Sequence, residues 1–491
     1  MRSFCTNSYR LYKTFENMRL QVSMLPTYFV VLLGTVFFLT QASCTKSQAW
    51  LQFESPEAVG FSSLKLELAR QFADSMSSGA VMVIYQGHVV SAWGDIERKF
   101  RMHSVRKSLL SALYGIGVEE DVIDLHTQLE DLDIAGFDLL TQSESQASLR
   151  DLISSRSGVY LPAAYAPDNQ DRNRPPRGSH PPGTHWFYNN WDFNVAGVIY
   201  EHETGRDLYT AFDEAIAKPL GMEDFGVSDG FRVIEPGLSP HPAHTFRMST
   251  RDLARFGQLF LQQGEWNGQQ IISEEWVDES TKQISDLGDG QGYAYMWWTV
   301  EAGSYEKRFP GRFSNVAQYD IYLGRGSGGQ GVVVIPDLDM VFVHRGDTDQ
   351  GRGVGGATPL AVLDKILAAK EGELQLNPGL KPVEAIPFSS QNPAYEEPPF
   401  TSFPPSHYKP FLGEYELGPD AIARVFMFED RPFMYVPGEG EAELFAISET
   451  TFTIRVVSNV DIEFETGEQG QVVAVNLALG SRQMRAVKRQ G

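Results

Sequence analysis

Cysteine is nearly absent from this chain of 491 residues, which contains only Cys5 and Cys44. Both lie within the first 44 residues, so a chain processed near Cys44 has no pair with which to form an internal disulfide. A histidine-based metal centre is equally unsupported, because His241 and His244 are close in sequence but have no third ligand nearby. We therefore expect no bound metal and no cofactor.

Positive charge is also scarce. The chain has 41 Lys and Arg against 63 Asp and Glu, for a net charge of −22, and no basic stripe is visible. Nucleic acids and anionic membrane surfaces attract basic patches, so this composition argues against both as partners.

The apolar run at the N-terminus, Tyr28–Leu39, is shorter than the roughly 20 residues that span a membrane. It follows Lys13 and Arg19, and this order of basic residues and a short apolar run is typical of an export signal. We predict that residues 1–44 are an export leader of a bacterial protein. An uncleaved anchor is the alternative.

Cys44 closes this leader and resembles a bacterial lipoprotein acceptor, although Gln41 stands where such sites usually carry Leu. Initiation at Met18 or Met24 would give a more usual leader length. Lipid attachment at Cys44 and plain secretion therefore both remain open. The protein is expected in the periplasm, held to the membrane by a lipid, or outside the cell.

Residues 45–372 have strand patterns at both ends and mostly helical patterns between them. The pattern predicts an α/β (α+β) domain with one antiparallel sheet, flanking helices and a helical insertion. An amphipathic helix is expected over 62–77, with Leu64, Leu68, Phe72 and Met76 at helical spacing. The other expected elements are strands 80–85, 88–93, 318–323, 331–335 and 340–344, and helices 251–261 and 359–370.

Two further segments complete the chain. Residues 373–405 read as a linker, because eight prolines stand between Pro378 and Pro405. Residues 406–491 alternate short β-rich runs with turns, which predicts a small all-β domain.

Ser104 and Lys107 form an S-x-x-K pattern, which puts a hydroxyl and an amine on one face of a helix. The amine can then take the proton of the serine and make it a nucleophile. The pattern occurs five times, but only here does an apolar helix with small residues, Ser108–Val118, follow it. An ordinary helix cap is the alternative.

Two other patterns carry polar groups of the same kind. Tyr188-Asn189-Asn190 is the only Y-x-N in the chain, and a tyrosine beside a lysine can share its proton if nearby cations lower the tyrosine pKa. Gly326-Ser327-Gly328-Gly329-Gln330 lies between two strands and lacks the Lys and helix of a phosphate loop. Its backbone N–H groups are candidate oxyanion donors.

In this order, the three patterns resemble those of the serine β-lactamase and penicillin-binding superfamily, in its class C and esterase branch. The closest likeness is to 6-aminohexanoate-dimer hydrolase-like serine hydrolases. It covers about residues 55–370. Supporting segments are Trp93-Gly94-Asp95, Ser155–Val159, Pro182-Gly183-Thr184 and Met248–Gly257.

The resemblance assigns roles to the matching residues. Ser104 would be the acylated nucleophile, Lys107 its base, and Tyr188 the group that passes protons to the leaving group. Asn190, Ser327 and Gly328 would contact substrate, and the N–H groups of Ser104 and Gly329 would bind the oxyanion.

One departure affects the substrate. Gly326 stands where β-lactamases carry Lys or His, a cation that helps to bind a substrate carboxylate. Its absence favours less anionic substrates. The expected function is hydrolysis of small esters or of linear or cyclic amides through a serine acyl-enzyme. A penicillin-binding D,D-peptidase and a catalytically weak lipoprotein that binds cell-wall peptides are the alternatives.

Overall fold

The computed structural model describes residues 49–389, 397–418, 421–457, 460–480 and 482–489. The predicted leader, with its lipidation candidate Cys44, lies outside the described residues. None of the helices in the described ranges has both the length and the apolarity needed to cross a membrane.

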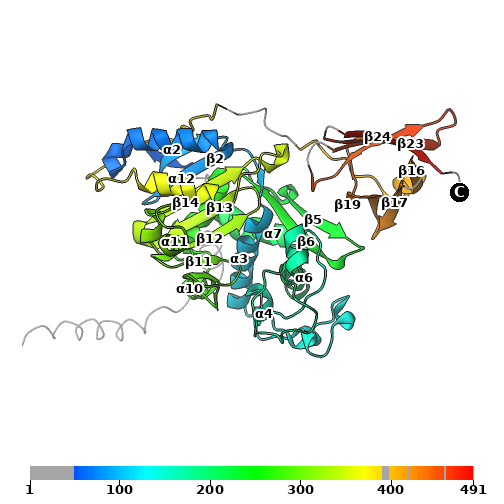
Figure 1. Ribbon diagram of the computed structural model, residues 1–491, viewed down its shortest axis with the longest axis horizontal. Helices are drawn as coiled ribbons and strands as arrows, with labels where there is room; N and C mark the ends of the chain where they lie inside the picture. Colours follow the sequence, from blue (N-terminus) through cyan, green and yellow to red (C-terminus); the bar gives the residue numbers. More distant parts are fainter. Residues whose placement is uncertain (1–48, 390–396, 419–420, 458–459, 481, 490–491) are drawn as a thin grey trace, which may run out of the picture. The chain divides into compact units, whose positions relative to one another are not determined.

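A ten-stranded sheet forms the centre of the first domain (Figure 1). All its pairings are antiparallel except that of β1 with β3. In spatial order the strands are β15 (Leu380–Pro382), β1 (Leu51–Phe53), β3 (His88–Gly94), β2 (Ser78–Tyr85), β14 (Met340–Gly346), β13 (Gln330–Ile335), β12 (Ile321–Gly326), β11 (Trp298–Val300), β10 (Gln291–Tyr293) and β9 (Ser285–Asp286). The two ends of the domain thus meet where β2 pairs with β14, as the sequence pattern predicts.

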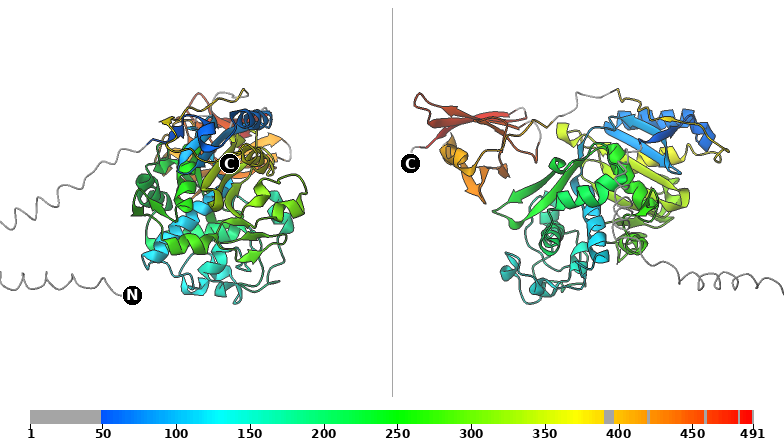
Figure 2. Two further views of the ribbon diagram at one scale, coloured as in Figure 1. Left: turned by 90° about the vertical axis from the view of Figure 1, so that its left-hand side faces the viewer. Right: turned by 180° about the vertical axis from the view of Figure 1, so that it is seen from behind.

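Helices cover both faces of this sheet, which is why its central strands β2, β13 and β14 are buried along almost their whole length and are mostly apolar. Along β2, Val81 and Val83 face one core while Ala80 and Met82 face the other. Helices α2 (Ser63–Ser75) and α12 (Thr358–Leu367) pack on the first face, and α3 (Arg106–Glu119) and α9 (Thr250–Leu261) on the second (Figures 1 and 2). Burying a side chain of the size of Val or Met stabilises the folded state by roughly 1.5–3 kcal/mol.

The remaining elements of this domain are short, apart from α6 and β6. The helices are α4 (Leu149–Ile153), α5 (Asp168–Asn173), α6 (Asn190–Thr204), α7 (Leu208–Phe212), α8 (Lys218–Leu220), α10 (Glu274–Thr281) and α11 (Ser304–Arg308). Strands β4 (Phe100–Arg101), β5 (Gly230–Glu235) and β6 (Ser239–Met248) form a second sheet, and β7 (Glu265–Trp266) pairs with β8 (Gln269–Gln270).

The structure corrects the buried face predicted for the first helix. Leu64 and Leu68 are 72% and 56% exposed, whereas Leu66, Ala69 and Ala73 are buried. An i, i+4 series drifts by about 40° per step around a helix, so it does not stay on one face. The alanines bring α2 close to the sheet, a contact that counting large apolar residues misses.

Two strand predictions also change. β12 begins at Ile321 rather than at residue 318, because a short 3₁₀ turn, Val316–Gln318, comes first. Strand β6 was not predicted, since Pro240 and Pro242 break its pattern, and it carries the two histidines that were considered as metal ligands. His244 contacts Glu201 instead, at 3.2 Å.

The segment predicted as a linker is partly built into the sheet. Strand β15 pairs with β1, and Ile386 bridges to Trp93. Phe388 is buried in the core beneath α2 and α12. The predicted linker has few apolar residues and many prolines, so no periodicity in its sequence indicates that Phe388 is buried.

The C-terminal residues form a nine-stranded antiparallel sheet with its own core, preceded by α13 (Pro405–Tyr408). This agrees with the predicted all-β fold. Its strands are β16 (Gly413–Gly418), β17 (Ala421–Phe428), β18 (Arg431–Val436), β19 (Gly440–Glu443), β20 (Phe445–Ala446), β21 (Thr451–Thr453), β22 (Val460–Thr466), β23 (Val472–Leu479) and β24 (Arg482–Lys488).

Candidate active site

Ser104 lies in a one-turn 3₁₀ helix, His103–Val105, that runs directly into α3. The chain before it is β4, so a strand delivers the serine to the start of a buried helix. No side chain caps α3, whose N-cap position is Val105. Ser104 is therefore not the helix cap that the sequence left as an alternative. It lines a cavity instead.

Lys107 is buried and makes three short polar contacts. Its Nζ lies 3.1 Å from the Ser104 hydroxyl, 2.6 Å from the Tyr188 hydroxyl and 2.8 Å from Asn190 Oδ1. Burial, and then the nearby charge of Arg106, lower the pKa of Lys107 well below its usual value. A lysine without its proton can accept one from Ser104, as a general base must.

Tyr188 comes from the loop that ends where α6 begins. Burial raises the pKa of its phenol, and a hydrogen bond with Ser104 and the charges of Arg106 and Arg325 only partly oppose that effect. A lowered pKa is the condition under which Tyr188 is expected to share its proton with Lys107. The structure does not meet that condition, so Tyr188 is better suited to pass on a proton than to remove one.

Asn190 is the first residue of α6, and its side chain contacts the buried lysine. Its Oδ1 accepts a hydrogen bond from Lys107, and its Nδ2 donates to the carbonyl oxygen of Tyr165 at 2.6 Å. The side chain is 3% exposed. Both ends of the amide thus have a partner within the protein, and Asn190 holds the lysine in place. Its predicted contact with substrate stays a prediction.

The glycine-rich loop between β12 and β13 lies beside the nucleophile. A Cβ atom at Gly326 would stand 2.6 Å from the Met102 carbonyl oxygen and 3.0 Å from the Ser104 nitrogen, so only glycine fits this approach. Gly328 and Gly329 adopt left-handed backbone angles, with φ of 73° and 85°.

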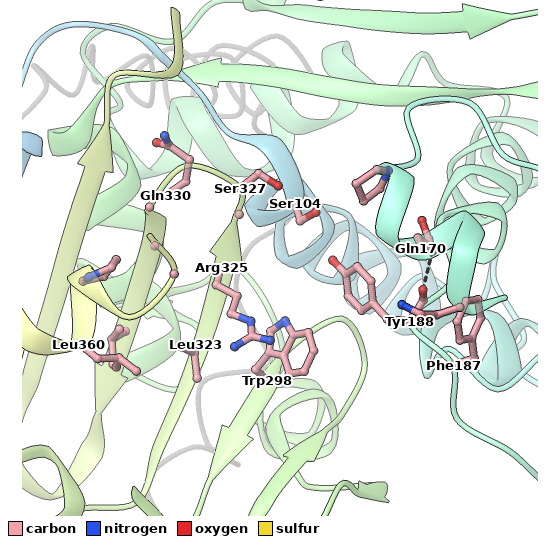
Figure 3. Close-up of a pocket in the computed structure, with 18 of the residues that line it drawn as sticks. Ser104, Gln170, Phe187, Tyr188, Trp298, Leu323, Arg325, Ser327, Gln330 and Leu360 are labelled. Atoms are coloured by element: carbon pink, nitrogen blue, oxygen red, sulfur yellow. Dashed lines mark hydrogen bonds between the residues drawn. The ribbon is translucent and has the colours of Figure 1, made fainter. Parts of the chain in front are cut away.

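The predicted residues of this loop divide into two groups. Ser327 and Gly329 line the cavity, and Figure 3 shows Ser327 beside Ser104. Gly328 does not line it; its carbonyl accepts a hydrogen bond from the Val354 N–H at 3.1 Å. His344 Nδ1 donates to the carbonyl of Gly329 at 2.7 Å and fixes the end of the turn.

The cavity has a volume of about 640 Å³ and opens in front of Ser104 (Figure 3). Its apolar and aromatic lining, called here the aromatic wall, comes from both sides of the cavity and consists of Trp186, Phe187, Trp298, Leu323, Val333, Pro359 and Leu360. Polar side chains are Gln170, Asn173, Arg325, Ser327 and Gln330. No carboxylate lines it among the side chains that the structure describes.

Arg325 provides a cation at the cavity, one residue before the position where the sequence lacks Lys or His. It follows Gly324 near the end of β12, and its guanidinium carbon lies 3.8 Å from the centroid of the Trp298 ring. The sequence motif includes Gly326 but not Arg325, so no motif indicates this cation. Trp298 also lines the cavity, whereas its neighbour Trp297 is buried in the core.

Comparison with known proteins identifies relatives of this chain. A family model described as Beta-lactamase matches residues 67–348. A D-aminopeptidase of Brucella anthropi is 29% identical over 170 residues, which are 30% of this chain and 32% of the relative. A D-aminopeptidase of Cereibacter sphaeroides is 31% identical over 166 residues, 29% of this chain and 32% of the relative. The chain thus spans about a third of the length of these curated relatives.

Two solved structures are similar to this chain at lower identity. A Bacillus anthracis protein described as a 6-aminohexanoate-dimer hydrolase is 20% identical, with a TM-score of 0.48 over 66% of this chain and 90% of its own. A penicillin-binding protein homologue from Pyrococcus abyssi is 15% identical, with a TM-score of 0.45 over 86% and 99%. Because the family model matches more than half of its residues, the chain belongs to the beta-lactamase family.

Proposed function

We propose that this protein is a serine hydrolase that cleaves small amide, peptide or ester substrates through an acyl-enzyme on Ser104. The observation that carries the proposal is the triplet of contacts around Lys107, whose amine reaches the Ser104 hydroxyl, the Tyr188 hydroxyl and Asn190. Burial favours the neutral form of that amine. A neutral amine next to a serine hydroxyl is what nucleophilic catalysis requires.

In the acylation step, Lys107 takes the proton of Ser104 while Oγ attacks the substrate carbonyl carbon. The Ser104 N–H and an N–H of the loop 326–329 bind the resulting oxyanion. The intermediate collapses as the C–N or C–O bond breaks. The leaving group takes its proton from Lys107 through the Tyr188 hydroxyl.

Deacylation repeats these steps with water. Lys107, again neutral, accepts a proton from a water molecule as the water oxygen adds to the acyl carbon. Collapse breaks the bond to Ser104 Oγ, which recovers the proton, and the acid is released. Tyr188, whose pKa burial raises, keeps its own proton at neutral pH and relays others.

The cavity supports a substrate with an apolar portion and a negatively charged group. The aromatic wall suits the first, and Arg325 suits the second. The relatives named D-aminopeptidases make a peptide with a D-residue a reasonable candidate. A free ammonium group close to Arg325 would, however, be repelled by its positive charge. We therefore favour an N-blocked or carboxylate-bearing amide over a substrate with a free amine.

The protein is proposed to act after export, either with a lipid on Cys44 or free of one. Fractionation of cells that carry a lipid-analogue label, with a Cys44→Ala variant as control, separates the two. Label in wild type alone would support the lipid, and an unlabelled protein in the periplasm or medium would support plain secretion. A protein found in the cytoplasm would contradict export.

A burst experiment tests the hydrolase. The exported portion is mixed with a p-nitrophenyl ester, and any adduct is located by peptide mass spectrometry. A burst followed by turnover, with the adduct on Ser104, is expected; Ser104→Ala should lose both without unfolding. A Ser104 adduct that persists without turnover, with labelled penicillin bound, would favour the penicillin-binding alternative. Absence of any Ser104 adduct in folded protein would contradict the proposal.

A further inference from the structure

We propose that Tyr165 is a positioning residue, which connects the nucleophile to the base by binding the neighbours of both. The inference rests on the proposed function of Ser104 and Lys107 and adds to it a residue outside the three sequence patterns. Tyr165 is partly buried on the loop that precedes α5.

The first connection runs from the Tyr165 hydroxyl to the residue before the nucleophile. This hydroxyl lies 2.9 Å from His103 Nδ1, and the two rings are nearly parallel, with 7° between their planes. On the far side of the imidazole, Nε2 lies 3.0 Å from the Thr348 hydroxyl. The histidine is thereby held on both nitrogens, and Ser104 is the next residue along the chain.

The second connection runs from the Tyr165 backbone to the base. Its carbonyl oxygen accepts a hydrogen bond from Asn190 Nδ2 at 2.6 Å, and Asn190 Oδ1 accepts one from Lys107. An amide with its Nδ2 satisfied in this way cannot rotate without losing a buried hydrogen bond. The orientation of Oδ1 towards Lys107 is therefore set by where Tyr165 lies.

Backbone strain marks the same two residues. His103 and Tyr165 both have left-handed φ angles, 46° and 57°, which residues other than glycine seldom adopt. Such angles persist only where surrounding contacts over-determine them, and they gather at functional sites. The Tyr165 N–H donates to Glu235 Oε2 at 2.9 Å, which helps to hold its angle. A change in the backbone of His103 would move the Ser104 hydroxyl relative to Lys107.

Geometry of this kind affects the rate of chemistry more than substrate binding. A misplacement of about 1 Å between reacting groups can reduce a rate by roughly a hundredfold. Removing the Tyr165 hydroxyl leaves the carbonyl contact to Asn190 in place, so Tyr165→Phe should have a smaller effect. We expect the acylation rate constant to fall by about tenfold.

The experiment is stopped-flow acylation by a p-nitrophenyl ester, with the burst rate constant and the burst amplitude recorded separately. Tyr160→Phe is the matched control, because Tyr160 is also buried and its hydroxyl has no hydrogen-bond partner among the described residues. His103→Asn is a second variant that keeps a residue tolerant of left-handed angles and removes the imidazole.

Mispositioning and unfolding give different results in this assay. Mispositioning lowers the rate constant at full amplitude, whereas an unfolded fraction lowers the amplitude at an unchanged rate constant. The proposal expects the first for Tyr165→Phe and His103→Asn, with Tyr160→Phe equal to wild type. Wild-type rate constants in both variants, or a loss of amplitude alone, would overturn it. Wild-type protein without a Ser104 adduct would instead overturn the proposed function, and this role for Tyr165 with it.

Discussion

At the scale of single residues, the chemistry depends on whether Lys107 carries a proton. Burial and Arg106 lower its pKa, so the neutral, basic form appears at a lower pH than for an exposed lysine. The acylation rate should therefore rise with pH through this pKa and level off above it. Lys107→Met should abolish this rise of the rate with pH and slow acylation by roughly 10²–10⁴-fold.

Lys65→Met is the control for this prediction. Ser62 and Lys65 form another S-x-x-K pair, but the side chain of Lys65 is 46% exposed and pairs with Glu371. The measurement is the burst rate constant as a function of pH for the wild type, Lys107→Met and Lys65→Met. A rise with pH that survives in Lys107→Met would identify a different base.

Arg325 is predicted to select the charge of the substrate. Arg325→Gln should raise KM for an anionic ester roughly tenfold, or about 1.4 kcal/mol, and leave a neutral ester of equal size almost unchanged. Arg325→Lys keeps the charge and should lose less. The measurement compares p-nitrophenyl hemisuccinate with p-nitrophenyl butyrate. Equal changes for both esters would show that Arg325 shapes the cavity without reading charge.

At the scale of elements, the site depends on how closely β12 approaches the start of α3. Gly326→Ala would place a Cβ 2.6 Å from a backbone oxygen that cannot move aside easily. We expect a loss of roughly 1–3 kcal/mol in the free energy of unfolding, together with slower acylation. At Gly226 the nearest atom to an added Cβ is 3.9 Å away, so Gly226→Ala should be almost neutral. Urea titration of both variants measures the difference.

The elements differ in how far the sequence could predict them. The hairpin of β2 and β3 and the core strands β13 and β14 follow from apolar runs with turn residues between them. The buried face of α2 does not, because alanines at contact positions look neutral in a pattern. Strand β6 cannot be predicted from its pattern either, because Pro240 and Pro242 interrupt it. Its pairing with β4 and β5 becomes apparent only in the folded structure.

The same distinction applies within the site. Ser104, Lys107 and Tyr188 stand out through spacing, and the structure brings their polar atoms together. Arg325 has no spacing of its own and becomes visible only when β12 aligns it with Trp298. Tyr165 and His103 are still harder to predict from sequence, because their contact joins segments 62 residues apart. It also depends on left-handed backbone angles, which no residue pattern in the sequence indicates.

At the scale of the whole molecule, the C-terminal domain contacts the surroundings of Tyr165. Val456 packs in the same small apolar cluster as Tyr165, Phe231 and Val233. Its carbonyl oxygen accepts a hydrogen bond from Arg101 at 2.5 Å. Because Val456 packs in the same cluster as Tyr165, the C-terminal domain helps to hold Tyr165 in place. It is therefore expected to influence acylation without entering the cavity.

Val456→Ala tests this influence. It should lower the acylation rate constant by about two- to tenfold, which corresponds to at most about 1.4 kcal/mol in the barrier. Val457→Ala is the control, since that neighbour is 53% exposed. Identical burst rates for the two folded variants would mean that the C-terminal domain is only attached and does not contribute.

Strand β15 has a consequence for the behaviour of the protein in concentrated solution. It is three residues long, lies at one end of the large sheet and covers β1. Without it, β1 would offer free backbone groups to a second molecule, which is how sheets extend into aggregates. Pro382 lacks an N–H, so β15 itself is a poor template for another strand. The segment after the enzyme domain thus keeps one molecule from adding to the next, and a chain cut before Leu380 should self-associate.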